Sequence, residues 1–360
     1  MNDLNKILSQ FKVDGAVKSI QPYGNGHINH TFLAVTEDET GKIKRYILQA
    51  VNKNVFPDGE ALMSNVQKVT EYLKPNATDP RSVMQLIPTV DGGYFCLDDE
   101  NTCWRVYDFI ENSICLERVE STDDFYQCAY GFGNFQKQLS QFPVETLNET
   151  IPDFHNTPKR YENFLKAVEA DVCGRAAGVK EEIEFVKSEK DFCSVLYDNM
   201  KCGKLPLRVT HNDTKSNNVM LDASTRKALC VIDLDTIMPG FSVNDFGDAI
   251  RFGASTAAED EKDLSKVSLN LDLFDIYAKG FLDGCGDGLT KDEIMLLPEG
   301  AKMMTLECGM RFLTDYLEGD VYFRTAYDDH NLVRCRTQFE LVKDMNRKWQ
   351  QMKDIIKKYL

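Results

Sequence analysis

The chain has 360 residues, of which 42% are hydrophobic, and it carries a formal net charge of −15 with a sequence pI near 4.9. This length and apolar content suffice for two domains or two lobes with a large core. The charge and the lack of any Lys/Arg block argue against nucleic acid as a partner, because binding to a phosphate backbone needs a cationic surface. ATP is not excluded, since backbone amides and Mg²⁺ can meet its charge locally.

The cysteines and the N-terminal stretch indicate a compartment. Eleven cysteines are scattered with no CxxC or paired Cys/His spacing, which predicts neither a zinc site nor a disulfide framework and fits a reducing environment. The first 15 residues lack the organisation of a signal peptide, and no stretch is apolar enough to span a bilayer. We therefore expect a soluble, cytoplasmic protein without a membrane partner.

The first 110 residues are predicted to be mostly β-structure. One helix, which begins at Pro57–Glu60 and runs to about Leu73, interrupts the strands. The predicted strands are 16–23, 31–36, 45–51, 82–90, 94–97 and 103–110.

Two features of this region bear on phosphate binding. Gly24 and Gly26 lie between two predicted strands, so they indicate a glycine-rich hairpin whose backbone can approach phosphates; an ordinary hairpin turn is the alternative. A dinucleotide-binding loop is disfavoured because a strand, not a helix, follows. Gln49 occupies the position in strand 45–51 where protein kinases place a phosphate-pairing Lys. This departure predicts either weak nucleotide affinity or compensation by another cation.

After Glu111 the pattern becomes helical. Phenylalanines and other apolar residues recur at steps of three and four over 122–142, with Ser121 or Thr122 as the N-cap. Further helices are predicted from Thr157 to about Gly174 and over 180–200. We therefore expect a β-rich nucleotide-binding lobe at 1–110 and a mainly helical lobe at 111–360. ATP is expected in the cleft, with its adenine bonded to the backbone near Tyr107 and Phe109.

The segment 205–236 carries the predicted chemistry. Short apolar runs at 205–210, 219–221 and 228–232 are typical of buried strands, and polar residues occupy the connections. Asp213 precedes Asn218 by five residues and Asp233 by twenty. Phosphoryl transfer in kinase folds uses one carboxylate to orient the attacking hydroxyl, and an amide oxygen and a second carboxylate to hold Mg²⁺. The spacing matches that requirement.

These motifs resemble a known family. The glycine hairpin, the 211–218 loop and Asp233 are similar to those of the aminoglycoside-phosphotransferase-like branch of the protein-kinase-like fold. Within it, HNDTKSNNVML, VIDLDTIMPG and NDFGDAIRFGASTAAEDE resemble the N-acetylhexosamine 1-kinases. The resemblance implies an α+β, two-lobed protein-kinase-like fold. It also implies transfer of a phosphoryl group from ATP, with Mg²⁺, to the anomeric hydroxyl of N-acetylglucosamine or N-acetylgalactosamine in carbohydrate metabolism.

The resemblance also implies residue roles. Asp213 matches the catalytic base, Lys215 a catalytic-loop lysine, and Asn218 and Asp233 the metal ligands. The remaining matched positions are Gly24, Gly26, Asn29, Gln49, Tyr107 and Phe109 for the nucleotide, and Phe252, Arg311, Tyr322, His30 and Trp349 for the sugar.

Several of these residues have plainer readings. Arg311 follows Glu307 by one helical turn and could form a surface ion pair with it. Trp349 lies on an apolar stripe that runs from Val342 to Tyr359, as a core residue would, and Tyr322 could cap a loop. The Asp245-Phe246-Gly247 tripeptide looks like a metal motif but comes too late after Asp213. We therefore expect Asp245 and Asp248 to anchor the 211–218 loop by hydrogen bonds.

Three functions compete at this point. The first is an N-acetylhexosamine 1-kinase. The second is a kinase, in the same fold, of another sugar, choline, ethanolamine or an aminoglycoside, and the negative net charge would suit a cationic acceptor. The third is a non-catalytic nucleotide-binding module, which the intact Asp213, Asn218 and Asp233 argue against. Either a monomer or a homodimer is compatible with the sequence.

Overall fold

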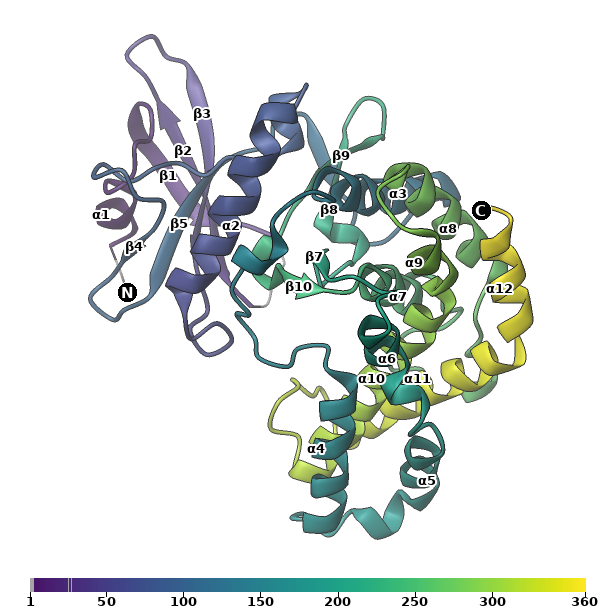
Figure 1. Cartoon of the computed structure of the whole chain (residues 1–360). Coiled ribbons are helices and arrows are strands. Elements are labelled where there is room, and N and C mark those ends of the chain that lie inside the picture. The colour runs from purple at the N-terminus through teal and green to yellow at the C-terminus, as the bar shows by residue number, and fades with distance from the viewer. Residues whose placement is uncertain (1–2, 25, 27) are drawn as a thin grey trace. The chain divides into compact units, whose positions relative to one another are not determined.

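The computed structural model describes residues 3–24, 26 and 28–360 and divides them into two compact units (Figure 1). Unit 1 comprises residues 1–114, 142–151 and 220–238, and unit 2 comprises residues 115–141, 152–219 and 239–360. Unit 1 thus contains two segments from later in the chain than the predicted N-terminal lobe.

An antiparallel five-stranded sheet forms the centre of unit 1, in the order β1-β2-β3-β5-β4. The elements of this region are α1 (Leu4–Leu8), β1 (Ala16–Pro22), β2 (His30–Glu37), β3 (Ile43–Ala50), α2 (Gly59–Leu73), β4 (Cys96–Leu97) and β5 (Cys103–Asp108). A second sheet, β6-β8-β9, lies mostly in unit 1 and consists of β6 (Ser113–Cys115), β8 (Val219–Asp222) and β9 (Ala228–Val231).

The two faces of the larger sheet bury different chemistry. Alternate residues of β3, including Tyr46 and Leu48, form an apolar cluster with Ile7 and Leu8 of α1. The opposite face carries Gln49 and, on β5, Arg105. Helix α2 lies against β5, where a Cβ on Gly59 would come within 2.9 Å of the Cβ of Cys103 (Figure 1).

Unit 2 is mainly helical. Strands β7 (Arg208–Thr210) and β10 (Met238–Gly240) form a two-stranded sheet. All of its residues belong to unit 2 except Met238, which is assigned to unit 1. The helices of unit 2 are α3 (Thr122–Gln138), α4 (Thr157–Ala170), α5 (Lys180–Ser188), α6 (Val195–Lys201), α7 (Ser242–Gly253), α8 (Leu271–Cys285), α9 (Lys291–Met295), α10 (Leu297–Glu318), α11 (His330–Arg347) and α12 (Trp349–Lys357).

The predicted phenylalanine stripe of α3 is buried, and Ser121 is the N-cap, accepting a hydrogen bond from the backbone N–H of Asp124. Helices α3 and α8 approach so closely that a Cβ on Gly133 would clash with the carbonyl oxygen of Phe281. No helix of the described residues is long and apolar enough to cross a membrane. The predicted order, an antiparallel sheet followed by a mainly helical region in a kinase-like fold, is confirmed.

Three predicted elements were wrong. Residues 82–90 do not form a strand; Leu86 and Thr89 make only isolated bridges, because Pro88 has no N–H to continue a ladder. The helix predicted over 180–200 is interrupted after Ser188 near Glu189, whose carboxylate accepts hydrogen bonds from Lys302 and Asn346.

The apolar stripe from Val342 to Tyr359 belongs to two helices instead of one. They are separated at Lys348, whose ammonium group binds Asp344 and the carbonyl oxygen of Leu269.

Candidate active site

The Asp213 loop, residues 211–218, connects β7 to β8. The Asp213 side chain is 25% exposed, and its Oδ1 lies 2.8 Å from the ammonium nitrogen of Lys215. Asn218 closes the loop by donating from Nδ2 to the backbone carbonyl of Asp213 at 2.8 Å and to its Oδ2 at 3.2 Å. The structure therefore brings together three of the predicted site residues, with one carboxylate accessible to solvent.

Helix α7 holds this loop through its backbone. Asp245 accepts hydrogen bonds from the N–H groups of His211 (2.9 Å) and Asn212 (2.8 Å). Asp248 accepts one from the N–H of Thr214 at 3.1 Å. The prediction that Asp245 and Asp248 anchor the loop is confirmed.

The two anchoring carboxylates differ electrostatically. Burial raises the pKa of Asp245, whose partners are N–H donors from the backbone and from Gln136. Burial would also raise the pKa of Asp248, but Arg251, which pairs with it at 3.0 Å, and Lys215 together lower it below its ordinary value. Arg251 and Lys215 therefore outweigh burial at Asp248, whereas burial outweighs the lowering effects of His211 and the N–H donors at Asp245.

His211 braces the same loop. Its ring is buried and lies edge-to-face against Phe132 and Phe135 of α3. Its Nδ1 accepts a hydrogen bond from the N–H of Asp213 at 3.3 Å. These contacts give His211 a structural role in holding the loop.

The glycine hairpin of unit 1 joins β1 to β2. Gly24 has φ +76°, a left-handed conformation that favours glycine, and no atom lies within 4 Å of where its Cβ or that of Gly26 would be. Residues 25 and 27, which belong to the predicted motif, lie outside the described residues. The exposed His30 begins β2.

Gln49 is engaged inside the sheet. It lies in register between Thr31 of β2 and Arg105 of β5. Its Nε2 donates to Thr31 Oγ1 at 3.0 Å, and its Oε1 accepts from Arg105 Nε at 3.1 Å and Nη2 at 2.9 Å. At the position where protein kinases place a lysine, this chain thus has a neutral side chain, Gln49, that is hydrogen-bonded to the cation Arg105.

Sequence reasoning missed Arg105 and its partner Asp235. Arg105 is 1% exposed, Asp235 is 4% exposed, and Arg105 Nη1 lies 2.6 Å from Asp235 Oδ1. Two signals in the sequence could have pointed to the pair: a lone Arg in the apolar strand CWRVYD, and a second Asp two residues after Asp233.

Strand β5 and the residue that follows it hold the other nucleotide candidates, Tyr107 and Phe109. Tyr107 is buried, and burial raises the pKa of its hydroxyl. The N–H of Phe109 donates to the carbonyl of Arg45, and the Phe109 ring lies 4.0 Å from the Arg45 guanidinium and edge-to-face against Tyr23. Phe109 therefore lies beside the residue that precedes the glycine hairpin.

Asp233 follows β9 and begins a short turn, residues 233–236, here named the Asp233 turn. Its backbone is left-handed (φ 60°, ψ 59°) and its side chain is exposed. Within the described residues no cluster of three or more His, Cys, Asp or Glu side chains could hold a metal. Mg²⁺ needs few protein ligands, because it keeps several waters and takes further ligands from phosphates.

Arg311 and Tyr322 lie together in unit 2. Arg311 on α10 donates to the Tyr322 hydroxyl at 3.3 Å, and its guanidinium also lies over the ring of Phe154 at 5.6 Å. Tyr322 is 66% exposed and follows α10. The predicted surface ion pair between Glu307 and Arg311 is wrong, because Glu307 is buried and its oxygens bind His155 Nδ1 at 2.8 Å and the Thr157 hydroxyl.

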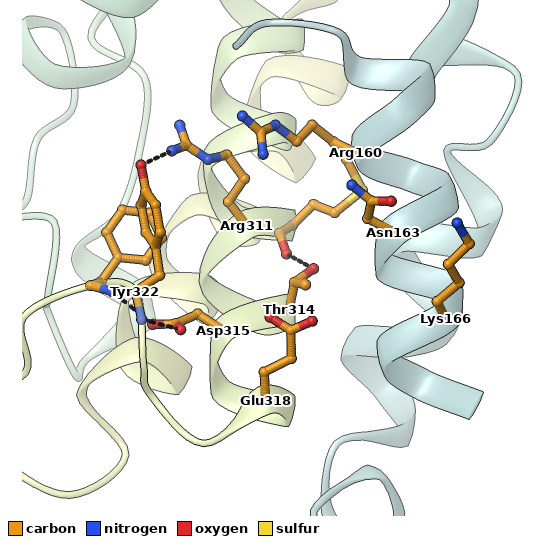
Figure 2. Close-up of a pocket in the computed structure, with 10 residues that line it drawn as sticks. Arg160, Asn163, Lys166, Arg311, Thr314, Asp315, Glu318 and Tyr322 are labelled. Atoms are coloured by element: carbon orange, nitrogen blue, oxygen red, sulfur yellow. Dashed lines mark hydrogen bonds between the residues drawn. The ribbon is translucent and has the colours of Figure 1, made fainter. Parts of the chain in front are cut away.

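A cavity of about 250 Å³ lies between α4 and α10 (Figure 2). The guanidinium groups of Arg160 and Arg311 point toward one another at one end of it, and Lys166 lies further along α4. Burial and the nearby Arg311 lower the pKa of Arg160, and its buried Nε has no hydrogen-bond partner among the described residues. The remaining lining residues are Asn163, Met310, Thr314, Asp315, Glu318, Tyr322 and Phe323.

The other two acceptor candidates in unit 2 have different surroundings. Phe252 is 52% exposed near the end of α7, next to Arg251. Trp349 begins α12 and packs edge-to-face on Phe192, with Lys302 and Lys353 near its ring. No contact found in the described residues joins Trp349 to Arg311 or Tyr322.

Comparisons with known proteins identify the family of the chain and solved structures with a similar fold. Residues 19–267 match the model of the family described as "Phosphotransferase enzyme family". The fold resembles the microcompartment-associated aminopropanol kinase, with a TM-score of 0.65, 14% identity, and coverage of 97% of this chain and 98% of that chain.

Two further solved structures share the fold. One is an aminoglycoside phosphotransferase from Alicyclobacillus acidocaldarius (TM-score 0.59, 11% identity, 99% and 94% coverage). The other is an amicoumacin kinase in complex with AMP-PNP, Ca²⁺ and Ami (TM-score 0.56, 13% identity, 94% and 92% coverage). At these identities the likeness concerns the fold.

Proposed function

Because the chain belongs to the phosphotransferase enzyme family and is thus an ATP-dependent kinase of small molecules, we propose that its acceptor is an N-acetylhexosamine. The reaction transfers the γ-phosphoryl group of ATP to the C1 hydroxyl of N-acetylglucosamine or N-acetylgalactosamine and yields the sugar 1-phosphate. The single observation that carries phosphoryl transfer is the Asp213 loop, in which one accessible carboxylate is held by Lys215, Asn218 and the backbone anchors of α7.

Asp213 orients the acceptor hydroxyl and takes its proton as the phosphoryl group is transferred. Lys215, whose ammonium nitrogen lies 2.8 Å from Asp213 Oδ1, offsets negative charge on the moving phosphoryl group. No covalent enzyme intermediate is needed, because positioning and charge stabilisation account for catalysis in this reaction class.

Asn218 and Asp233 are the residues that would hold Mg²⁺. Asn218 donates through Nδ2 to Asp213, which leaves its amide oxygen as the ligand atom, and the Asp233 carboxylate is exposed. Mg²⁺, when bound, would neutralise negative charge on the phosphates.

We assign the nucleotide to unit 1. The glycine hairpin at Gly24 and Gly26 has room for a phosphate to approach its backbone, and Asn29 follows it. The adenine would lie by the backbone of Tyr107 and Phe109, whose ring packs beside Arg45.

The cationic cavity beside Arg311 favours a neutral acceptor over choline, ethanolamine or an aminoglycoside. Its lining has three cations, Arg160, Arg311 and Lys166, and two carboxylates, Asp315 and Glu318. Asp315 is already bound by the backbone N–H groups of Tyr322 and Phe323. An ammonium group would be repelled there, whereas the hydroxyl and acyl oxygens of an N-acetylhexosamine can accept from arginine. Phe252, and less directly His30 and Trp349, complete the proposed acceptor contacts.

One observation favours a second candidate, a kinase of a small amino alcohol. The match to aminopropanol kinase covers 97% of the chain, and the net charge of −15 would attract a cation. The cavity at Arg160 and Arg311 argues against it.

A panel assay separates the two. The protein is incubated with ATP and Mg²⁺ and with N-acetylglucosamine, N-acetylgalactosamine, glucose, choline, ethanolamine, aminopropanol or an aminoglycoside, and ADP release is measured. We expect the N-acetylhexosamines to give the highest kcat/KM, with ³¹P NMR showing phosphate on C1. Faster ADP release with an amino alcohol would overturn the sugar assignment and leave the kinase class intact.

Arg311→Ala tests the acceptor side of the same proposal. We expect KM for the sugar to rise about 10–100-fold, since a charge-assisted hydrogen bond contributes about 1.5–3 kcal/mol, while KM for ATP changes little. Arg336→Ala, which removes an exposed arginine paired with Glu182, is the matched control. An unchanged sugar KM in Arg311→Ala would remove Arg311 from the acceptor site.

A further inference from the structure

Arg105 is a buried cation whose partners all lie in unit 1. Its Nε and Nη2 donate to Gln49 Oε1, and its Nη1 lies at ion-pair distance, 2.6 Å, from Asp235 Oδ1. The Nη1 contact is electrostatic more than directional, because this carboxylate oxygen lacks a partner with good hydrogen-bond geometry in the described residues. A buried guanidinium is costly unless it is paired, so the position of Asp235 is strongly constrained by Arg105.

Asp235 is also fixed from the glycine hairpin. Its Oδ2 accepts a hydrogen bond of 2.6 Å from Asn29 Nδ2, and Asn29 Oδ1 accepts from the backbone N–H of Asn52 at 3.0 Å. The Asp235 carboxylate therefore connects the Asp233 turn to Arg105 of β5 and to Asn29, which follows the glycine hairpin.

The same turn carries Asp233 in a conformation that needs support. A left-handed backbone is unfavourable for a residue other than glycine and persists where the surroundings hold it. Two residues later, Asp235 is buried and bound, whereas the Asp233 side chain is exposed.

We propose that Arg105 and Asp235 form a positioning pair that fixes the Asp233 carboxylate for the metal–nucleotide complex. Arg105 lies directly opposite Gln49, on the strand next to the position where protein kinases place a phosphate-pairing lysine. This inference rests on the proposed function, in which Asp233 holds Mg²⁺.

The identity of residue 49 follows from this pair. Thr31, Gln49 and Arg105 lie side by side in register on β2, β3 and β5. A lysine at position 49 would place a second cation against a buried guanidinium, whereas the glutamine oxygen accepts two of its N–H groups. A positive charge at position 49 and the positive charge of Arg105 therefore exclude one another.

The test measures the Mg²⁺ requirement of nucleotide binding without any acceptor, together with thermal stability. The full chain is titrated with ADP at a series of Mg²⁺ concentrations, by calorimetry. In Arg105→Gln we expect the Mg²⁺ concentration for half-maximal nucleotide affinity to rise about 10-fold or more, as is typical when a group that orients a metal ligand is lost. Metal-free ADP binding should change less than about 2-fold. Arg81→Gln, which removes another arginine of unit 1 that pairs with Asp79 and Asp222, is the matched control.

A double variant separates positioning from stability. Arg105→Met/Asp235→Leu replaces the pair with apolar side chains, an exchange that is often neutral for folding. We expect its melting temperature to lie nearer that of the wild type than that of Arg105→Gln, while its Mg²⁺ requirement stays raised. A folded Arg105→Gln or double variant with the wild-type Mg²⁺ requirement would overturn the inference.

The outcomes also distinguish this inference from the proposed function. If the wild-type protein binds ADP with no dependence on Mg²⁺, the proposed metal role of Asp233 itself fails. If the wild type shows that dependence and the variants share it unchanged, only the positioning pair is rejected.

Discussion

The Asp213 loop and the Asp233 turn hold their chemical groups in different ways. In unit 2 the Asp213 loop is held through its backbone, because Asp245 and Asp248 accept hydrogen bonds from three of its N–H groups. In unit 1 the Asp233 turn is held through one side chain, Asp235, which pairs with Arg105 and Asn29.

This difference affects how the Asp213 loop and the Asp233 turn tolerate substitution. A loop held by its main chain keeps its path when its own side chains change, so Asp213 can be replaced without losing the anchors. A turn held by a buried ion pair depends on both partners, since removing one leaves an uncompensated charge. Changes in unit 2 should therefore separate activity from stability more cleanly than changes in the network of unit 1.

The largest expected effect tests the first half of this comparison. Asp213→Asn should lower kcat about 10²–10⁴-fold, because the general base is lost, with little change in melting temperature, because the anchors from α7 remain. Initial rates and thermal unfolding measure the two quantities. Activity close to that of the wild type would show that Asp213 is not the base.

Gln49→Lys tests the second half. A lysine beside the buried Arg105 should destabilise the protein by ~3 kcal/mol and weaken nucleotide binding as well. Denaturant unfolding and calorimetry report the two effects. Gln21→Lys, the same substitution at an exposed position of β1, is the control. A stable Gln49→Lys variant with unchanged ATP binding would show that position 49 is far from both the cation and the phosphates.

Asp245→Asn should affect both activity and stability, in contrast to Asp213→Asn. An amide can accept on one oxygen only, so at least one buried N–H of the loop loses its acceptor, at a cost of about 1–3 kcal/mol. We expect a lower melting temperature and a reduced kcat. Asp123→Asn, an exposed change on α3, is the control, and full stability in Asp245→Asn would contradict backbone anchoring.

Acid titration tests the pairing of Asp248 with its cations. The pKa of Asp248 is lowered in the folded protein by Arg251 and Lys215, below the unfolded value of 3.8. Its contribution to stability is therefore complete above that value and is lost as the pH falls through the folded pKa. The melting-temperature difference between wild type and Asp248→Asn should shrink from about pH 6 to about pH 3. A constant difference over this range would contradict pairing with these cations.

Tyr322→Phe should give the smallest effect. It removes one acceptor of Arg311 at the edge of the cavity, a hydrogen bond of about 1 kcal/mol, so the KM for the sugar should rise about 2–5-fold with kcat unchanged. Tyr130→Phe, a partly exposed tyrosine on α3, is the control. A changed kcat would mean that Tyr322 acts on the reacting group.

The contrast also explains what the sequence could predict. The Asp213 loop was recognisable because its chemistry lies within a few residues, and Asp245 and Asp248 follow on the next helix with helical spacing. Arg105 and Asp235 could not be paired from the sequence, because they are distant in the chain and no local periodicity connects them.

The same limit applies to the fold and to the acceptor side. Strands such as β2 and β3 and the buried face of α3 follow periodicity and were predicted well. The breaks at Glu189 and Lys348 depend on partners from other helices, so periodicity predicted continuous helices there. Likewise, local spacing suggested a surface ion pair between Glu307 and Arg311. The partners that Glu307 has in the structure, His155 and Thr157, lie about 150 residues earlier, so local spacing could not reveal them.

The discontinuous path of unit 1 has a consequence for synthesis. Asn29 and Asp235 are separated by 206 residues, and the last segment of unit 1, residues 220–238, emerges only after residues 115–141 and 152–219 of unit 2 have been made. At ~5–20 residues per second, Arg105 would have to wait on the order of ten seconds for its carboxylate. During that time the sheet would either stay open at Arg105 or depend on chaperones, so the N-terminal strands released alone, as residues 1–114, should not reach their native packing.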